Sequence, residues 1–182
     1  MEYLDIPCNF VANFWVGDNL VENADALCAL TRANKGGVFN KLISVQSGAM
    51  VETYLTEIVF RAQNYSQEGV PNIPDEDRAL IAEKTLDKFA TIVDCFRRHK
   101  VLDVLAPDIY DELHRLRKFR NKIHIHAKTF PELSQHEKDI FTDDIVNWCL
   151  RLNCTIAKFL SEQMPRPERL HVFTEHMSLP SP

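Results

Sequence analysis

The sequence predicts an all-α fold, an antiparallel up-and-down bundle of four to five helices. Three observations indicate this: apolar residues recur at helical spacing, strand-like alternation is scarce, and polar or Gly-containing breaks separate the periodic stretches. Long amphipathic helices joined by short connections are expected to pack antiparallel. The 182 residues, with 45% hydrophobic and 26% charged content, suit one globular domain.

The first two helices are expected after a mixed, aromatic stretch over 1–18, which we interpret as a packed arm without regular structure. Apolar spacing predicts a helix over about 20–32. The Gly36-Gly37 pair then ends it, because glycine suits the position just past a helix C-terminus. A longer amphipathic helix is expected over 40–63.

Three further helices complete the expected bundle, which occupies 19–164. Acidic residues in the first turn favour a third helix over 75–99. A fourth is expected over about 106–120 and a fifth over about 135–164. The last stretch, 165–182, holds four of the nine prolines and no periodic pattern, so we expect a flexible tail there.

The composition excludes several classes of protein. No window approaches 18 uninterrupted apolar residues, so a membrane span is not expected. The opening MEYLDIPCNF has two acids and no base, unlike a secretory signal. Five cysteines without repeated spacing suit reduced thiols. We therefore expect a cytoplasmic protein without a cofactor.

Positive charge is concentrated in one short segment, from His114 to Lys128. The chain as a whole has a net charge of −5, but this segment holds six Lys/Arg, three of the seven His and no acid. The other 15 Lys/Arg are set against 26 Asp/Glu, a net charge of −11 for the rest of the chain. The net charge therefore indicates no general affinity for nucleic acid, and this segment is the local exception.

Arg120 interrupts the apolar stripe of the fourth helix. The stripe steps through Ile109, Leu113, Leu116 and Ile123. At about 100° per residue, Arg120 lies at the edge of that stripe. Burial of an unpaired guanidinium is costly, so either a carboxylate of the bundle pairs with Arg120 or the stripe faces a cleft.

An arginine and a histidine at one cleft can cleave RNA without a metal. The guanidinium is a planar donor that matches phosphate, and imidazole exchanges protons near neutral pH. The histidine takes the proton of the 2′-hydroxyl or protonates the leaving 5′-oxygen, while the arginine stabilises the charge that develops on the phosphorane.

The run Arg120-Asn121-Lys122-Ile123-His124-Ile125-His126 resembles the signature of HEPN domains, an Arg followed after four to six residues by His, with the Asn that many members carry. The order of elements is similar over about 20–164. The resemblance implies a helical bundle that dimerises. In active members it also implies a metal-independent endoribonuclease, with Arg and His from both protomers, that leaves 2′,3′-cyclic phosphate ends.

The resemblance also implies roles for particular residues. Arg120 would bind the scissile phosphate, Asn121 would orient the site, and His126 would be the general acid or base. His124, with three intervening residues, falls outside the signature and is the second choice. Glu52, on the long second helix, is a weaker candidate for an accessory polar residue.

The expected partners are RNA, a second copy of the chain, and an antitoxin or other regulatory protein, because the superfamily includes toxins and defence effectors. Further phosphate contacts could come from the basic residues near the signature: Arg115, Arg117, Lys118, Lys122 and Lys128. Lys128 stands where some toxin members carry a tyrosine that a nucleotidyltransferase modifies, so that mode of neutralisation is in doubt here.

Alternative interpretations stay open at this stage. The chain could be a non-catalytic HEPN-like module that binds RNA, a nucleotide or a protein. It could also be a structural bundle in which Arg120 pairs with an acid such as Glu52 or Asp87. The flanking basic residues could be a solvated face. No metal site is expected, because His124 and His126 diverge by about 160° on a helix.

Overall fold

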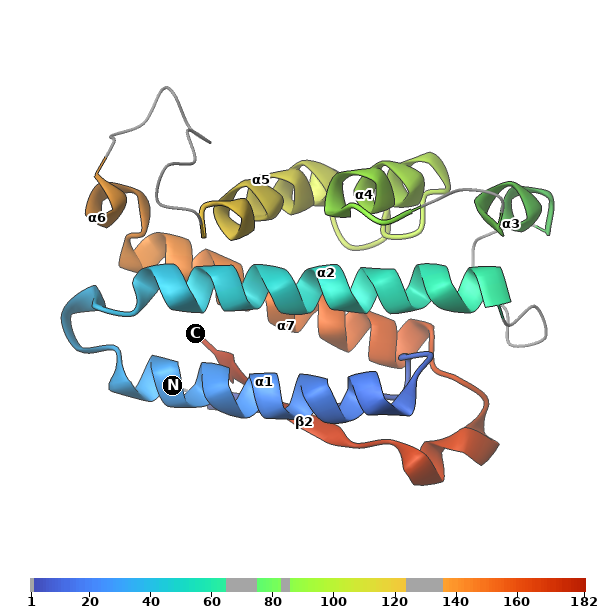
Figure 1. Ribbon diagram of the computed structural model, residues 1–182, viewed down its shortest axis with the longest axis horizontal. Helices are drawn as coiled ribbons and strands as arrows, with labels where there is room; N and C mark the ends of the chain where they lie inside the picture. Colours follow the sequence, from blue (N-terminus) through green and yellow to red (C-terminus); the bar gives the residue numbers. More distant parts are fainter. Residues whose placement is uncertain (1, 65–74, 83–85, 124–135) are drawn as a thin grey trace.

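The computed structural model describes residues 2–64, 75–82, 86–123 and 136–182 and is mainly helical, as the sequence predicts (Figure 1). Its α-helices are α1 (Phe14–Ala33), α2 (Asn40–Asn64), α3 (Asp75–Ala82), α4 (Phe89–Arg98), α5 (Ile109–Asn121), α6 (Glu137–Ile140) and α7 (Asp143–Gln163). Short 3-10 helices span Lys35–Gly37 and Glu168–Phe173, and strands β1 (Glu2–Pro7) and β2 (His176–Ser181) form a small antiparallel sheet.

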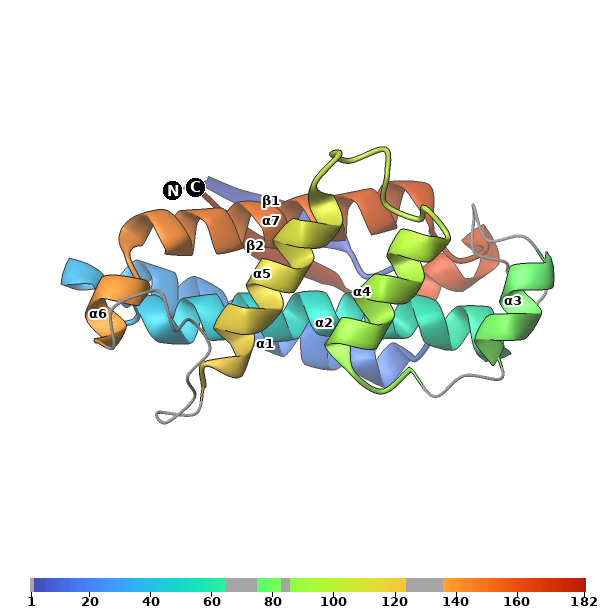
Figure 2. The same ribbon diagram turned by 90° about the horizontal axis from the view of Figure 1, so that it is seen from above.

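Helix α2 is the centre of the molecule and contacts α1, α3, α4, α5 and α7. Helices α1, α2 and α7 follow the long axis, and α4 and α5 cross α2 on the side opposite α1 (Figures 1 and 2). Apolar residues at helical spacing along α2 are fully buried: Ile43, Val51, Leu55 and Ile58. No described helix is long and apolar enough to cross a bilayer. Because neighbours lie on both sides of it, α2 supplies side chains to two separate grooves.

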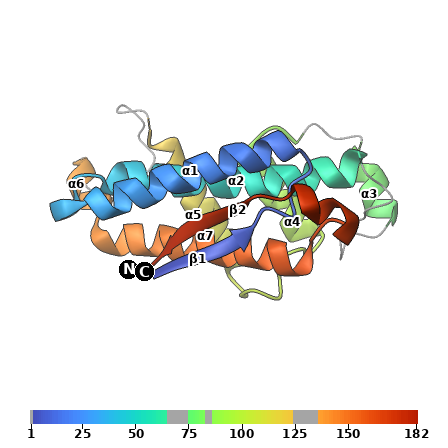
Figure 3. The same cartoon turned by 90° about the horizontal axis from the view of Figure 1, so that it is seen from below.

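The two ends of the chain form the sheet. Strand β1 pairs with β2 so that Glu2 lies opposite Ser181, and the termini are side by side (Figure 3). Met177 and Leu179 of β2 are fully buried, and β2 packs against α1 and α7. The structure therefore differs from the irregular arm and flexible tail that the sequence predicts, because burial of these alternating side chains holds the strand in place.

The predicted helix bounds agree best with the observed bounds where the apolar pattern is long. Helix α2 matches its prediction within one residue, and α5 begins three residues after the predicted start of the fourth helix and ends one residue after its predicted end. Helix α1 starts earlier than predicted, at Phe14.

Two predictions of continuous helix are wrong. The predicted third helix is divided into α3 and α4, with Lys88 in an extended conformation just before α4. The predicted fifth helix is divided into α6 and α7, where Thr142 caps α7 by accepting a hydrogen bond from the N–H of Ile145. The first of these breaks places the N-terminus of α4 in the same cleft as Arg120.

Candidate functional site

Helix α5 carries Arg120, and the predicted apolar stripe is buried within this helix but not beyond its C-terminal end. Ile109, Leu113 and Leu116 are buried, as expected. Phe119 completes the stripe and packs edge-on against Phe141, with 5.8 Å between ring centroids. Ile123 lies beyond the end of α5 and is 54% exposed, so the prediction that it extends the stripe is wrong.

Gly48 of α2 sets the position of Arg120. A Cβ atom built on Gly48 would lie 2.7 Å from Cβ of Arg120 and 3.3 Å from its Cγ, closer than side chains tolerate. Only glycine therefore allows α5 to approach α2 this closely. An isolated glycine inside a helical pattern is a known sign of such close packing, and this signal was present in the sequence.

Glu52 lies one turn after Gly48 on α2 and forms an ion pair with Arg120, with 2.6 Å between Glu52 Oε2 and Arg120 Nη2. Arg120 Nη1 also donates a hydrogen bond to Asn121 Oδ1 at 3.0 Å. Of the two alternatives that the sequence left open for Arg120, the carboxylate partner is therefore present, and it is Glu52, one of the acids named as examples. The Arg120 side chain remains 39% exposed, so the pair orients the guanidinium at the surface.

The same carboxylate contacts the start of α4. The backbone N–H of Phe89, the first residue of α4, donates a hydrogen bond to Glu52. Burial raises the pKa of Glu52 above its ordinary value, while the positive charge of Arg120 and the hydrogen bonds from Phe89 and Arg120 act in the opposite direction. Glu52 therefore joins α2, α4 and α5 at one point.

An open cleft of about 330 Å³ lies at this junction. Its lining comprises Glu52, Asp87, Lys88, Phe89, Ala90, Arg117, Arg120 and Asn121. Three cations thus meet two carboxylates, an excess of one positive charge in a protein whose net charge is −5. The sequence left two alternatives open for Arg120, a carboxylate partner or a cleft, and the structure contains both.

Arg117 reinforces the positive side of the cleft. It precedes Arg120 by three residues on α5, so the two lie on neighbouring positions of one helix face. Its Nε atom is buried and has no hydrogen-bond partner among the described residues. Lys88 adds a third cation from the α4 side, which the sequence did not indicate because the predicted helix ran unbroken through this position.

Among the described residues, three other predicted basic residues, Arg115, Lys118 and Lys122, do not line the cleft. Arg115 lies over the ring of Trp148 on α7, with 4.4 Å from its guanidinium carbon to the centroid. Lys118 is exposed and Lys122 is buried, and neither lines the cleft. The predicted residues His124, His126 and Lys128 lie outside the described part of the chain.

The cysteines are free thiols in the core or its margin. Burial raises the pKa of Cys8 and Cys149 to about 12 and that of Cys154 to about 11. Such thiols stay protonated near neutral pH and make poor nucleophiles. Within the described ranges, no group of three or more His, Cys, Asp or Glu side chains is arranged to hold a metal ion.

Comparisons with protein-family models, with characterised proteins and with solved structures find no match to this chain. The resemblance to HEPN domains stays a prediction made from residues 120–126 and their context. Any function assigned to the protein therefore depends on the chemistry of the cleft.

Proposed function

We propose that the protein is a metal-independent endoribonuclease of the HEPN type, with Arg120 as the residue that binds the scissile phosphate. One observation carries the proposal. A surface arginine is held in a fixed orientation by a carboxylate, Glu52, in a cleft with more cations than acids. Oriented guanidinium groups in such surroundings suit phosphate, because the planar fork matches the phosphate oxygens.

The guanidinium of Arg120 keeps capacity for a ligand. It has five N–H donors, and its hydrogen bonds to Glu52 and Asn121 use two of them. The remaining donors can contact a phosphate. Arg117 and Lys88 line the same cleft and can contact the neighbouring phosphates of an RNA strand.

The chemistry proposed for this cleft needs one proton acceptor and one proton donor. His126 accepts the proton of the 2′-hydroxyl as that oxygen attacks phosphorus. Arg120 stabilises the charge on the phosphorane oxygens. The bond from phosphorus to the 5′-oxygen then breaks, the leaving oxygen takes a proton from a second histidine, and a 2′,3′-cyclic phosphate remains.

The second histidine in this proposal comes from a second copy of the chain. The proposed enzyme is therefore a homodimer, which brings two Arg120 residues and two histidines together. The proposal also includes an up-and-down bundle, in which the main helices pack antiparallel. An antitoxin or other regulatory protein as a further partner belongs to the same proposal. His124 is the alternative proton-transfer residue.

The decisive experiment is cleavage of a mixed RNA pool in EDTA. Wild type should cut and leave 2′,3′-cyclic phosphate ends, and Arg120→Ala and His126→Ala should each lower the rate by about 100-fold or more. Arg151→Ala is the matched control, because Arg151 is an exposed arginine on α7, outside the cleft lining. It should leave the rate unchanged.

Two results would contradict the proposal. Cleavage that survives both substitutions would place the active site elsewhere. A well-folded wild-type protein that binds RNA through Arg120 but never cuts it would favour the non-catalytic binding module instead. Circular dichroism of each variant shows whether lost activity reflects lost folding.

A further inference from the structure

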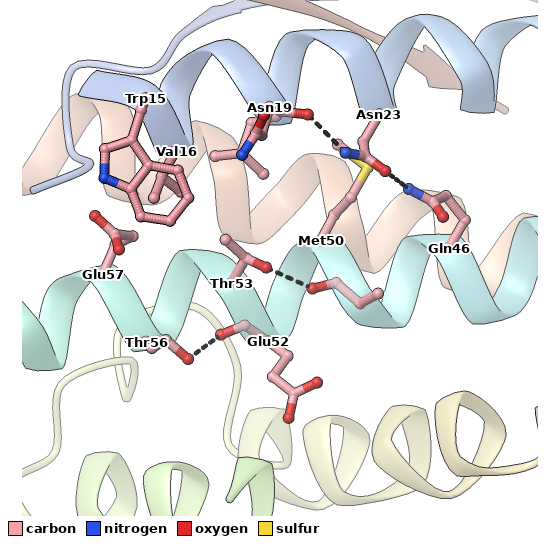
Figure 4. Close-up of a pocket in the computed structure, with 12 residues that line it drawn as sticks. Trp15, Val16, Asn19, Asn23, Gln46, Met50, Glu52, Thr53, Thr56 and Glu57 are labelled. Atoms are coloured by element: carbon pink, nitrogen blue, oxygen red, sulfur yellow. Dashed lines mark hydrogen bonds between the residues drawn. The ribbon is translucent and has the colours of Figure 1, made fainter. Parts of the chain in front are cut away.

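A second groove lies on the other side of α2, between α2 and α1, with a volume of about 460 Å³ (Figure 4). This volume is within the range of sites that hold small molecules. Its floor is apolar, made by Val16, Leu20 and Met50. Trp15 stands at one end with its side chain 65% exposed, so a large aromatic surface is open to a ligand.

The rim of this groove offers unused hydrogen-bonding groups. Among the described residues, nothing bonds the side-chain amide of Asn19, which therefore keeps a donor and an acceptor free. Gln46 donates through Nε2 to Asn23 Oδ1 at 2.5 Å and keeps its Oε1 as an acceptor. The hydroxyls of Thr53 and Thr56 donate to backbone carbonyls of their own helix.

The groove carries no positive charge and little free negative charge. None of its lining residues is Lys or Arg. The carboxylate of Glu57, on α2, accepts hydrogen bonds from two N–H groups just before α1, those of Ala12 at 2.8 Å and Asn13 at 2.9 Å. Glu52 directs its carboxylate away from α1 and towards α4 and α5 (Figure 4). A phosphate is therefore a poor ligand here, and a neutral planar group is a good one.

Glu52 lines both this groove and the Arg120 cleft, so the two cavities adjoin across α2. An RNA strand presents two chemistries next to each other: charged phosphates and neutral, planar bases that carry hydrogen-bonding edges. Aromatic side chains bind unpaired bases by stacking, and side-chain amides pair with base edges. The charged cleft fits the first chemistry and the neutral groove fits the second.

We propose that the α1–α2 groove is a nucleobase subsite, in which Trp15 stacks on an unpaired base while Asn19, one helical turn further along α1, contacts its edge. This inference rests on the proposed ribonuclease function and adds a base preference to it. A base next to the scissile phosphate would occupy the groove, and the endoribonuclease would favour the sequences that place an acceptable base there.

The test uses the fluorescence of Trp15. The chain has two tryptophans, so Trp148→Phe leaves Trp15 as the sole tryptophan reporter. Adenosine, guanosine, cytidine and uridine are titrated separately, since these nucleosides carry no phosphate. At least one should quench Trp15 saturably, and Asn19→Ala should weaken that binding roughly tenfold.

Two controls isolate the groove. Gln163→Ala removes an exposed amide on α7 and should leave nucleoside binding unchanged. The converse reporter, Trp15→Phe with Trp148 retained, should show no saturable quenching.

The outcomes separate this inference from the proposed function. If no nucleoside quenches Trp15 saturably while Arg120-dependent RNA cleavage is present, the subsite is refuted and the ribonuclease stands. If a nucleoside binds as described but RNA is never cut, the nucleoside site stands and the ribonuclease fails. If both hold, Trp15→Ala should raise KM for RNA roughly tenfold with a smaller change in kcat.

Discussion

Two arginines, Arg61 of α2 and Arg120 of α5, interrupt apolar helix faces in different ways. Arg61 is only 1% exposed, and its guanidinium donates to three backbone carbonyls, those of Phe10 at 3.1 Å, Met164 at 2.5 Å and Pro165 at 3.4 Å. These carbonyls belong to segments at opposite ends of the sequence. Arg61 therefore ties the chain ends to the central helix.

Arg120 is held by one carboxylate and one amide and remains 39% exposed. Its surroundings restrict its direction without enclosing it. The two sites differ in what holds the guanidinium. Carbonyl acceptors hold the buried guanidinium of Arg61 within the fold, whereas a single carboxylate beside an open cleft leaves that of Arg120 accessible, as the proposed phosphate contact requires.

The largest expected effect is the loss of stability when Arg61 is replaced. Arg61→Met leaves buried carbonyl oxygens without donors and should lower the free energy of unfolding by about 3 kcal/mol or more. Arg120→Met breaks a partly exposed ion pair and should cost about 1 kcal/mol or less. Urea denaturation of both variants measures this contrast, and equal losses would remove the distinction.

The next effect concerns the C-terminal segment, whose start is tied down by Arg61. Leu179→Ala in β2 removes a fully buried side chain and should cost about 2 to 3 kcal/mol, because a cavity remains between β2 and α1. Urea denaturation measures the loss. RNA cleavage per folded molecule should not change, since β2 does not line the cleft. If Leu179→Ala left the free energy of unfolding unchanged, β2 would contribute little to the stability of the fold.

Gly48→Ala should act on the cleft more than on the core. The added methyl group collides with Arg120, so we expect RNA cleavage to fall about tenfold and the free energy of unfolding by about 1 kcal/mol. Gly17→Ala is the matched control, because a Cβ there meets only ordinary contacts at 3.6 Å or more and should stabilise α1 slightly. If both substitutions preserve activity, Gly48 does not position Arg120.

The smallest effect is the pH dependence of Glu52. Burial raises its pKa in the folded state above the ordinary value of 4.5. Its contribution to stability is therefore present in full below the unfolded pKa and is lost as the pH rises through the folded pKa. Glu52→Gln removes this dependence. The melting temperature of wild type minus that of Glu52→Gln should therefore be larger at pH 4 than at pH 7. Calorimetry measures both melting temperatures, and a difference that does not change with pH would contradict the raised pKa.

Periodicity predicted the central helices because burial of a long amphipathic face determines them. It also placed Arg120 at the edge of the buried stripe, which predicted either a carboxylate partner, such as Glu52 or Asp87, or a cleft. The Ser-Gly-Ala run around Gly48 carried the signal for a close helix crossing, although the spacing alone did not say which helix approaches there.

The remaining features depend on contacts that leave no local pattern. The acceptors of Arg61 are backbone carbonyls up to 104 residues away, and any residue type can supply a carbonyl. The break before α4 has no Gly or Pro to mark it, so the contribution of Lys88 and Phe89 to the cleft was missed. Strand β2 offers only Met177 and Leu179 as alternating apolar residues, too few to predict a strand.

The central claim is that Arg120 is held for a phosphate and not for the fold. The most direct measurement determines the free energy of unfolding and the RNA cleavage rate on the same preparation of Arg120→Ala, with EDTA present. We predict a free energy of unfolding within about 1 kcal/mol of that of wild type and a cleavage rate lowered by about 100-fold or more. A variant that unfolds, or one that is stable and still cuts RNA at the wild-type rate, would contradict it.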